Sequence, residues 1–280
     1  MKSCFAFSVS LSFLLLILLS VYPQRSESAP LYLWHYCPNA TLFAINSTYQ
    51  SNLNALLSSL SSSAAAAAAT NNAGGFANAT AGQNPPDKAY GLFLCRGDVS
   101  ATTCSDCVTT GKKDILQRCP NQRVSAIWYE ECLLRYSNQS IFSVVEEVPA
   151  LLLRNITGNI TDPAKLVQVF GNTIKDVAWR ASGKTFAIAT ADVTTLERLY
   201  TMAQCTPDLT PWDCNTCLRS VIPLLPEGHV GGMMCTPSCI VRFALHLFYN
   251  ASVVPGPLPP PVTSAELAPV PPPHEGIWEM

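Results

Sequence analysis

The sequence has few charged side chains. Only 13% of its residues are Asp, Glu, Lys or Arg, and the formal net charge is −2 at pH 7. A protein that binds nucleic acid presents a concentration of basic residues to the phosphates, and a nearly neutral chain with so few charges does not provide one. We therefore expect no nucleic-acid partner.

The sequence also lacks the signatures of common catalytic sites. It contains no phosphate-binding loop and no kinase signature, and none of its four histidines accompanies a nucleophile motif such as Gly-x-Ser-x-Gly. Two pairs of adjacent carboxylates, Glu130 with Glu131 and Glu146 with Glu147, would point to opposite sides of a strand, so neither pair forms an acid and a base. We predict that the protein is not an enzyme and needs no cofactor.

Long apolar runs are missing after the first thirty residues, so no later segment is long enough to cross a bilayer. At the start, Lys2 precedes an uncharged apolar stretch at 5–21, and Ser26 and Ser28 place small residues at positions −3 and −1 of a cleavage site. This order is typical of a secretory signal peptide, which we predict at residues 1–28. An uncleaved signal anchor is the alternative, but the polar stretch before Ser28 favours cleavage. We expect a secreted, extracellular protein without a membrane span after signal cleavage.

Cysteine, in contrast, is abundant. The chain has twelve cysteines, of which Cys4 falls within the predicted signal peptide. In an oxidising compartment the remaining cysteines indicate disulfides rather than metal ligands, and their odd number leaves one thiol free or paired between chains. The secretory pathway also glycosylates Asn-x-Ser/Thr sequons. We predict N-glycosylation at Asn39, Asn46, Asn78, Asn138, Asn155, Asn159 and Asn250.

Part of the sequence is repeated. Three cysteines, with eight and then two residues between them, occur at Cys95, Cys104 and Cys107 and again at Cys205, Cys214 and Cys217. Downstream, the five residues that begin at Cys132 match the five that begin at Cys239: a cysteine, two aliphatic residues, an arginine and an aromatic residue. Two matches in the same order indicate two copies of one domain.

The repeats set the predicted domain boundaries. We assign the first domain to residues 29–138, a linker to 139–144 and the second domain to 145–252. Residues 253–280 are rich in proline and cannot bury a core, so we predict an unstructured tail there.

Each copy shows the same order of helical and strand-like patterns. Ser47 or Thr48 caps a helix whose leucines at positions 53, 56, 57 and 60 form one apolar stripe, and Asp162 with Pro163 begins its counterpart. Second helices follow the caps Ser100 and Thr210. Strand-like stretches lie at 89–95, 124–129, 132–136, 200–205 and 239–249. The pattern predicts an α+β fold with helices packed on an antiparallel sheet, in two domains in series.

Some of these residues resemble a known family. The paired cysteine spacing, the segment Tyr90–Asp98 (YGLFLCRGD) and Ile127-Trp128-Tyr129 before Cys132 resemble the plant cysteine-rich repeat secretory proteins. Their repeat is the ginkbilobin-like or salt-stress-response/antifungal domain, and the same tandem forms the ectodomain of cysteine-rich receptor-like kinases. The resemblance covers residues 30 to 250. It implies two helices on a five-stranded antiparallel sheet in each domain, stapled by disulfides.

The resemblance also implies how the cysteines pair, a choice that spacing alone leaves open among many pairings. The implied bonds are Cys37–Cys119, Cys95–Cys104, Cys107–Cys132, Cys205–Cys214 and Cys217–Cys239. The second copy has no counterpart of Cys37, and Cys235 is left over as the free thiol candidate. A buried, inert thiol and an accessible one are the two alternatives for it. Zinc is not expected at the closely spaced cysteine pairs, because no histidine accompanies them at ligand spacing. Thiol redox chemistry is not expected either, because both cysteines of each pair have disulfide partners in the scheme that the resemblance implies.

Family members include a mannose-binding antifungal protein, which implies candidate ligand residues. The family site uses an asparagine after the first cysteine, an arginine before the last and a glutamate beyond it. Here Asn39 stands one place late, Arg123 is the candidate arginine, and Ser137 occupies the glutamate position. The candidates are therefore Asn39 and Arg123, and we expect no metal site.

Three hypotheses for the function remain. The first is a non-catalytic protein of the plant apoplast that binds a ligand or protein partner in stress or defence, for example a cell-wall glycan or a receptor-like kinase ectodomain. The second is a mannose- or glycan-binding, lectin-like antifungal protein. The third is a kinase-less or truncated ectodomain of a cysteine-rich receptor-like kinase.

Overall fold

The computed structural model describes residues 29–70, 74–155 and 158–253. The predicted signal peptide at 1–28 and nearly all of the predicted tail at 253–280 lie outside the described residues. None of the helices within the described part is both long and apolar enough to span a membrane.

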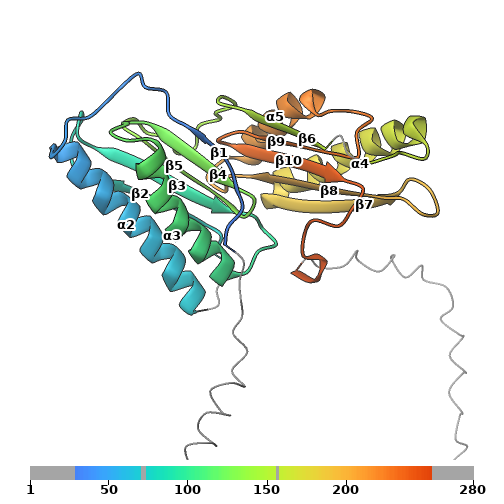
Figure 1. Ribbon diagram of the computed structural model, residues 1–280, viewed down its shortest axis with the longest axis horizontal. Coiled ribbons are helices and arrows are strands. Elements are labelled where there is room, and N and C mark those ends of the chain that lie inside the picture. Colours follow the sequence, from blue (N-terminus) through green and yellow to red (C-terminus); the bar gives the residue numbers. More distant parts are fainter. Residues whose placement is uncertain (1–28, 71–73, 156–157, 254–280) are drawn as a thin grey trace, which may run out of the picture.

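The first domain is a five-stranded antiparallel sheet with two helices on one face (Figure 1). Its elements are β1 (Tyr32–Tyr36), α2 (Thr48–Ala69), β2 (Phe76–Ala81), β3 (Ala89–Cys95), α3 (Ala101–Arg118), β4 (Ser125–Tyr129) and β5 (Cys132–Ser137). The strands lie in the order β1-β4-β5-β3-β2, so β1 and β2 form the edges.

The second domain repeats this plan. Its elements are β6 (Leu151–Asn155), α4 (Pro163–Lys184), β7 (Phe186–Asp192), β8 (Arg198–Cys205), α5 (Pro211–Val221), the 3-10 turn η1 (Ile222–Leu224), β9 (Gly231–Cys235) and β10 (Cys239–Ala244), followed by a 3-10 turn η2 (Ala251–Val253). The order β6-β9-β10-β8-β7 is the counterpart of the first sheet. The predicted fold class, two α+β domains with two helices on five antiparallel strands each, is confirmed.

The helices begin where the sequence predicts. At each start a side-chain oxygen accepts a hydrogen bond from a free backbone N–H of the first turn, which satisfies one of the donors that a helix leaves unpaired. The pairs are Ser47 with Gln50, Ser100 with Thr103, Asp162 with Lys165, and Thr210 with Asp213. Asp213 also accepts from the Thr210 hydroxyl at 2.6 Å, which fixes the cap of α5.

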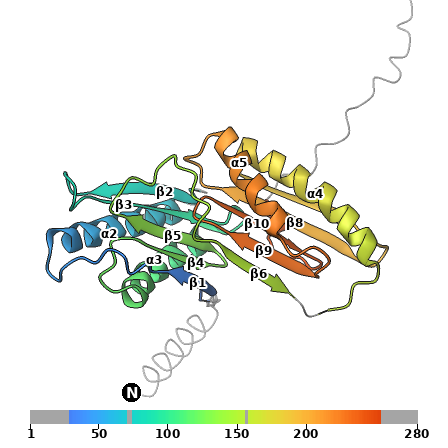
Figure 2. The same ribbon diagram turned by 90° about the horizontal axis from the view of Figure 1, so that it is seen from above.

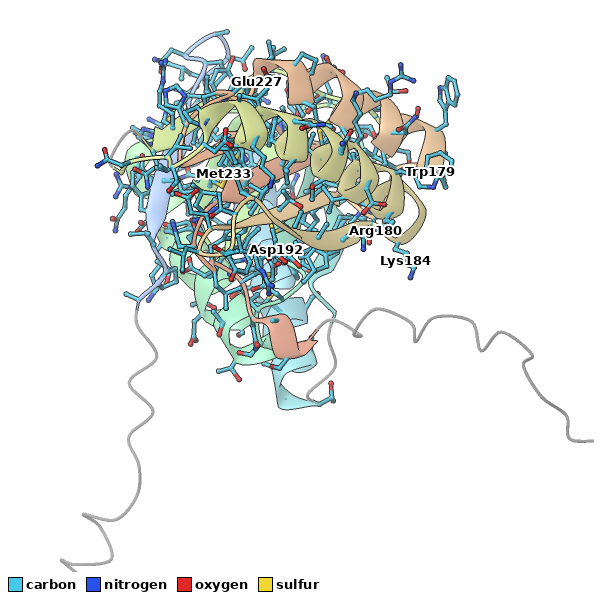
Figure 3. All side chains as sticks on the ribbon, turned by 90° about the vertical axis from the view of Figure 1, so that its right-hand side faces the viewer. Trp179, Arg180, Lys184, Asp192, Glu227 and Met233 are labelled. Atoms are coloured by element: carbon cyan, nitrogen blue, oxygen red, sulfur yellow. A yellow bond between two sulfur atoms is a disulfide. The ribbon has the colours of Figure 1, made fainter. Side chains whose placement is uncertain are left out.

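One face of each helix forms the domain core. The predicted leucine stripe of α2 is buried against the sheet, with Leu53 and Leu60 fully inaccessible to solvent. In the second domain Phe170 and Val177 of α4 are the counterparts. Each buried leucine or phenylalanine contributes about 1.5–3 kcal/mol to folding. The opposite face of α4 points to solvent, as Trp179 shows in Figure 3 with 72% of its surface exposed.

Two local predictions are wrong. The strand predicted at 239–249 ends at Ala244, because the chain leaves the sheet there and turns toward the first domain. Glu130 and Glu131 lie in the turn between β4 and β5, and Glu146 and Glu147 lie in an irregular segment before β6, so neither pair is in a strand. Neither pair is therefore divided between the two faces of a strand, and Glu130 instead accepts hydrogen bonds from arginines of both domains.

Candidate functional site

Five disulfides connect helices and strands within the domains. They join Cys37 to Cys119, Cys95 to Cys104, Cys107 to Cys132, Cys205 to Cys214 and Cys217 to Cys239, which are the pairs that the family resemblance implies. Among the described residues, Cys235 is the free cysteine.

The two sheets pack against each other through the faces that carry no helices. Side chains alternate along a strand, so Trp128 and Leu133 point away from the helices of the first domain, as Met233 and Cys235 do in the second. These four residues, with Ala126, form one buried cluster, which we call the domain junction. Figure 2 shows β4 and β5 beside β9 and β10 at this place.

The junction buries the free thiol of Cys235 and keeps it protonated. Cys235 is 1% exposed, and burial raises the pKa of its thiol to about 12. At physiological pH, Cys235 is therefore a protonated thiol. Because only the thiolate reacts readily, Cys235 is unreactive while the two domains remain together.

A compact group of charges borders the junction. Glu130 accepts a hydrogen bond from Arg96 of its own domain at 2.7 Å and a second from Arg242 of the other domain. Arg96 also binds both carboxylate oxygens of Asp98, at 2.5 and 3.0 Å. Burial, followed by the nearby charge of Arg96, lowers the pKa of Arg242 to about 10, so it remains a cation at physiological pH. The two cations, Arg96 and Arg242, balance the two anions, Asp98 and Glu130. The ion pair between Glu130 and Arg242 joins the two domains.

A close backbone contact lies beside these charges. The Gln204 side chain donates to the Cys95 carbonyl at 2.9 Å and accepts from the Gly97 N–H at 3.2 Å, so one amide links the domains twice. The ring of Phe186 packs on Gly97, and a Cβ added at Gly97 would lie 2.4 Å from the Phe186 Cγ. A residue larger than glycine does not fit without movement of the ring.

The segments that leave the two domains are exchanged between them. Asp98 and Asp208 occupy equivalent positions, three residues after the first cysteine of each repeated motif. Asp98 accepts from the Asn250 N–H at 2.8 Å, and Asp208 accepts from the Ser143 N–H at 2.7 Å. Each carboxylate thus binds the segment that follows the other domain. The predicted linker at 139–144 is therefore attached to the second domain rather than free.

An open hollow lies at the edge of the first domain, next to β1 and the end of α3. It has a volume of about 500 Å³ and is lined by Trp34, Tyr36, Asn39, Arg118, Pro120 and Gln122, together with His35, Leu42 and the Cys37–Cys119 disulfide. Small-molecule sites have volumes of roughly 300–1,000 Å³ and combine aromatic walls with a few polar groups. The Arg118 guanidinium lies 4.0 Å from the Tyr32 ring and is 40% exposed, so it keeps donors for a ligand.

The predicted ligand residues do not both face this hollow. Asn39 lines it, but its Oδ1 accepts from Gln122 at 2.6 Å and its N–H donates to the same side chain at 3.1 Å. Arg123 is not among the lining residues. Its guanidinium lies 4.5 Å from the Tyr49 ring and donates to the Pro86 carbonyl at 2.8 Å. The protein itself therefore uses the groups that the family site directs at a sugar, and Arg118 is the cation that the sequence argument missed.

The predicted glycosylation sites are accessible to different degrees. Asn39, Asn46, Asn78, Asn159 and Asn250 are exposed, whereas Asn138 and Asn155 are half-buried. Asn78 lies on the edge strand β2 and Asn155 on the edge strand β6. Glycans at these two positions would hinder pairing of the edges with other chains. Glycosylation of all seven stays a prediction.

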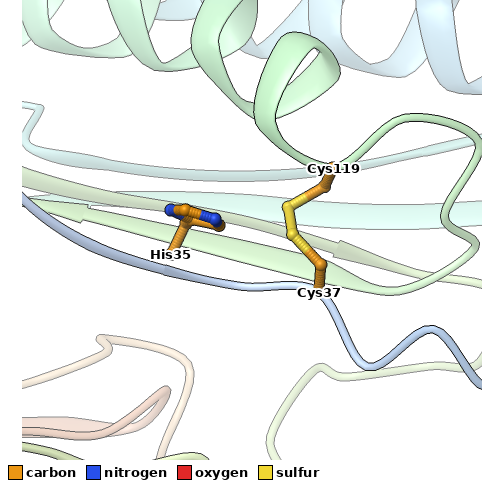
Figure 4. Close-up of side chains that lie close together, drawn as sticks. All are labelled: His35, Cys37 and Cys119. Atoms are coloured by element: carbon orange, nitrogen blue, oxygen red, sulfur yellow. A yellow bond between two sulfur atoms is a disulfide. The ribbon is translucent and has the colours of Figure 1, made fainter.

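His35 lies beside the Cys37–Cys119 disulfide (Figure 4). The Tyr32 hydroxyl forms a short hydrogen bond with its Nδ1 and holds the ring in place. Burial, and then the charge of Arg118, lowers the pKa of His35, which favours the neutral imidazole.

Known proteins resemble this chain over most of its length. The family model described as salt stress response/antifungal matches twice, at residues 36–139 and 154–246. Cysteine-rich receptor-like protein kinase 25 of Arabidopsis thaliana is 45% identical over 96% of this chain, which spans 40% of that relative. Kinase 8 of the same plant is 39% identical over 95% of this chain, again with 39% of its own length covered. The putative kinase 9 is 39% identical over 84% of this chain, and in this case 89% of the relative is covered.

Solved structures show the same architecture. The tandem DUF26 ectodomain of the Arabidopsis thaliana cysteine-rich receptor-like protein PDLP5 superposes with a TM-score of 0.61 at 27% identity, covering 76% of this chain and 98% of the ectodomain. The corresponding ectodomain of PDLP8 has a TM-score of 0.65 at 20% identity, covering 78% and 98%, and supports the fold alone.

The repeated cysteine motif, the two matching sheets and the double match of the family model agree with one another. The chain belongs to the salt stress response/antifungal family and carries two of its domains in tandem.

Proposed function

We propose that this chain is a secreted, non-catalytic protein of the plant apoplast that binds a ligand or a protein partner in stress or defence. The hollow beside β1 is the observation that carries the proposal, because it joins aromatic walls to an available cation. The relatives support an extracellular role, since the chain corresponds to about two fifths of cysteine-rich receptor-like kinase 25 and matches tandem ectodomains.

The arrangement of the domains supports a binding role. The junction buries the helix-free faces, and the exchanged segments tie each domain to the other. The helices, the sheet edges and the hollow remain on the outside for contacts with other molecules. A two-domain body held in this way loses little conformational freedom when it binds, which favours affinity.

The proposal is tested by comparing ligand binding after substitution of Arg118 and of a matched arginine, Arg180. Arg118 and Arg180 are both helical, both pair with an aspartate four residues earlier, and are 40% and 43% exposed. Glycan arrays and receptor-like kinase ectodomains would be screened with the mature, disulfide-bonded protein. For a ligand bound in the hollow, Arg118→Ala is expected to weaken binding roughly tenfold or more, since a hydrogen bond from a charged donor contributes about 1.5–3 kcal/mol.

Arg180→Ala is the control and is expected to leave binding unchanged. Equal effects of the two substitutions, or binding that survives Arg118→Ala, would remove the hollow from the proposal. Saturable binding of mannose or another cell-wall sugar, lost in Arg118→Ala, would support the lectin-like hypothesis. Binding to a receptor-like kinase ectodomain with a silent glycan array would support the protein-partner hypothesis.

The third hypothesis rests on the lengths of the relatives. The chain spans 39–40% of two receptor-like kinases but 89% of the putative kinase 9, so the family includes a relative of nearly ectodomain length. A kinase-less ectodomain relative would compete with receptors for a shared ligand. Sequencing of the transcript distinguishes this case, because an apolar segment encoded after residue 280 would indicate a membrane-anchored receptor.

A further inference from the structure

Three side chains of types that can bind a metal lie close together in the lining of the hollow. His35 lies in β1, Cys37 follows that strand by one residue, and Cys119 ends α3. One possible ligand atom from each residue lies within 4.8 Å of the others. Figure 4 shows the three side chains. In the structure the two sulfurs are bonded to each other, so the cysteines are not available as thiolates.

This disulfide is the most accessible of the five. Cys37 is half-buried, whereas the other nine bonded cysteines are buried and the most exposed of them, Cys132, reaches only 4%. Thiol exchange requires access of the attacking thiolate to a sulfur atom. A small dithiol can therefore attack the Cys37 sulfur first and release Cys119 as a thiolate.

The same architecture forms without a bond of this kind in the second domain. The second domain forms the same five-stranded sheet although it has no counterpart of Cys37. Two features hold Cys37 in position after reduction. Before it, β1 pairs with β4 up to Tyr36, opposite Ala126. After it, Asn39 makes two hydrogen bonds with Gln122. The two thiols therefore stay close to each other and to His35.

We propose that reduction of Cys37–Cys119 converts His35, Cys37 and Cys119 into a three-donor site for Zn²⁺ or a similar thiol-binding divalent metal. Two thiolates and one imidazole are ligands that zinc prefers, and a water molecule from the open hollow completes the tetrahedron. The Tyr32 hydroxyl on Nδ1 orients the ring and leaves the second ring nitrogen for the metal. The charges of the two thiolates outweigh that of the nearby Arg118 guanidinium.

The reaction balances in two steps. The dithiol supplies two electrons and becomes a cyclic disulfide, while its two protons pass to the sulfurs of Cys37 and Cys119. Metal binding then displaces both protons to solvent, so affinity rises with pH as for other thiolate sites.

The first test maps which bond is reduced. The intact mature protein is treated with limiting dithiothreitol, the reagent is removed by gel filtration, and free thiols are alkylated and located by mass spectrometry. Cys37 and Cys119 are expected to be labelled before any other bonded cysteine. Earlier labelling of another pair would overturn the proposal.

The second test measures metal binding with Cd²⁺ as the probe, through the ultraviolet charge-transfer absorption of thiolate–cadmium bonds. The reduced protein is expected to bind one Cd²⁺ per chain and the oxidised protein none at the same concentrations. His35→Gln should weaken binding by at least about tenfold, because it removes a direct ligand. His229→Gln, at a half-buried histidine of the second domain that lies far from this site in the sequence, is the control.

Folding is checked separately. Near-ultraviolet circular dichroism of the reduced protein shows whether the domain is intact, and a Cys37→Ser/Cys119→Ser variant shows whether it folds without the bond. Binding that is equal in His35→Gln and the unsubstituted protein would refute the site. The outcome does not depend on the proposed ligand function, since the readout is metal binding alone.

Discussion

Replacing Gly97 with alanine is expected to open the domain junction. The added Cβ would lie 2.4 Å from the Phe186 Cγ, whereas carbon atoms in contact are normally about 3.5–4.0 Å apart. Overpacking of this kind costs about 1–3 kcal/mol, and the half-buried Phe186 ring can yield toward solvent, so we expect about 1–2 kcal/mol. The same position supplies the N–H that binds Gln204, which lies on the other domain.

The rate at which a thiol reagent labels Cys235 reports opening of the junction. In the absence of a reductant it is the free thiol of the described chain and is buried in the junction, so a thiol reagent reaches it only when the domains separate. Where opening and closing are fast compared with labelling, the rate follows the population of the open form. A cost of about 1–2 kcal/mol then raises the labelling rate by about 5- to 30-fold.

Gly171→Ala is the matched control, because a Cβ at that helical position meets nothing within 4 Å. It should leave the labelling rate unchanged and raise the free energy of unfolding slightly, as alanine is the better helix former. In a Phe186→Ala background the penalty of Gly97→Ala should disappear. Two results would refute this reasoning. One is a Cys235 labelling rate in Gly97→Ala equal to that of the wild type, and the other is a faster rate from Gly97→Ala that persists in the Phe186→Ala background.

Three further outcomes are expected. Asp98→Ala should lower the free energy of unfolding by about 2–3 kcal/mol in a denaturant titration, because Arg96 then loses one of its two carboxylate partners and the Asn250 N–H loses its acceptor. Asp192→Ala on the exposed surface should cost less than about 1 kcal/mol; similar costs of the two substitutions would contradict this reasoning. The double variant Cys37→Ser/Cys119→Ser should fold but lose about 2–4 kcal/mol in the same titration, and an unfolded protein would show that the bond is essential. The pKa of Cys235 is raised to about 12 in the folded state, so its contribution to stability is present below the pKa of the unfolded thiol and is lost as pH rises toward the folded value. Between about pH 9 and pH 10.5 the unfolding free energy of the wild type should therefore fall more steeply than that of Cys235→Ala, and parallel curves would place the thiol outside the buried junction.

The sequence predicts each domain well because its signals are local. The caps at Ser47, Ser100, Asp162 and Thr210 act within one helical turn, so the residues alone identify them. The repeated cysteine spacing likewise identifies the duplication without knowledge of the fold. Local patterns do not predict β1, β2, β6, β7 and β9. In β7 and β9, alanine and glycine weaken the strand signal.

The domain junction follows from contacts between residues far apart in the chain, and periodicity alone does not reveal it. One signal was present: all five residues of β4 are buried, and its sequence Ser-Ala-Ile-Trp-Tyr shows no polar alternation. An antiparallel strand of this kind has both faces covered, and with helices on one face the second domain is the remaining cover. Arg118 was missed for a similar reason, because its place beside the hollow depends on how α3 ends against β1.

The exchange of segments between Asp98 and Asp208 gives the molecule the organisation of a symmetric dimer. Each domain offers the same acidic position and receives the same stretch of its neighbour, which is the defining property of an isologous contact. Two separate copies of one ancestral domain would meet in this way, and joining them in one chain makes the pairing intramolecular, at high effective concentration. Fusion also lets the halves diverge: only the first has the Cys37–Cys119 bond, and only the second contributes a free cysteine, Cys235, to the domain junction. A single-domain fragment would leave its helix-free face uncovered and is expected to pair with a second copy of itself.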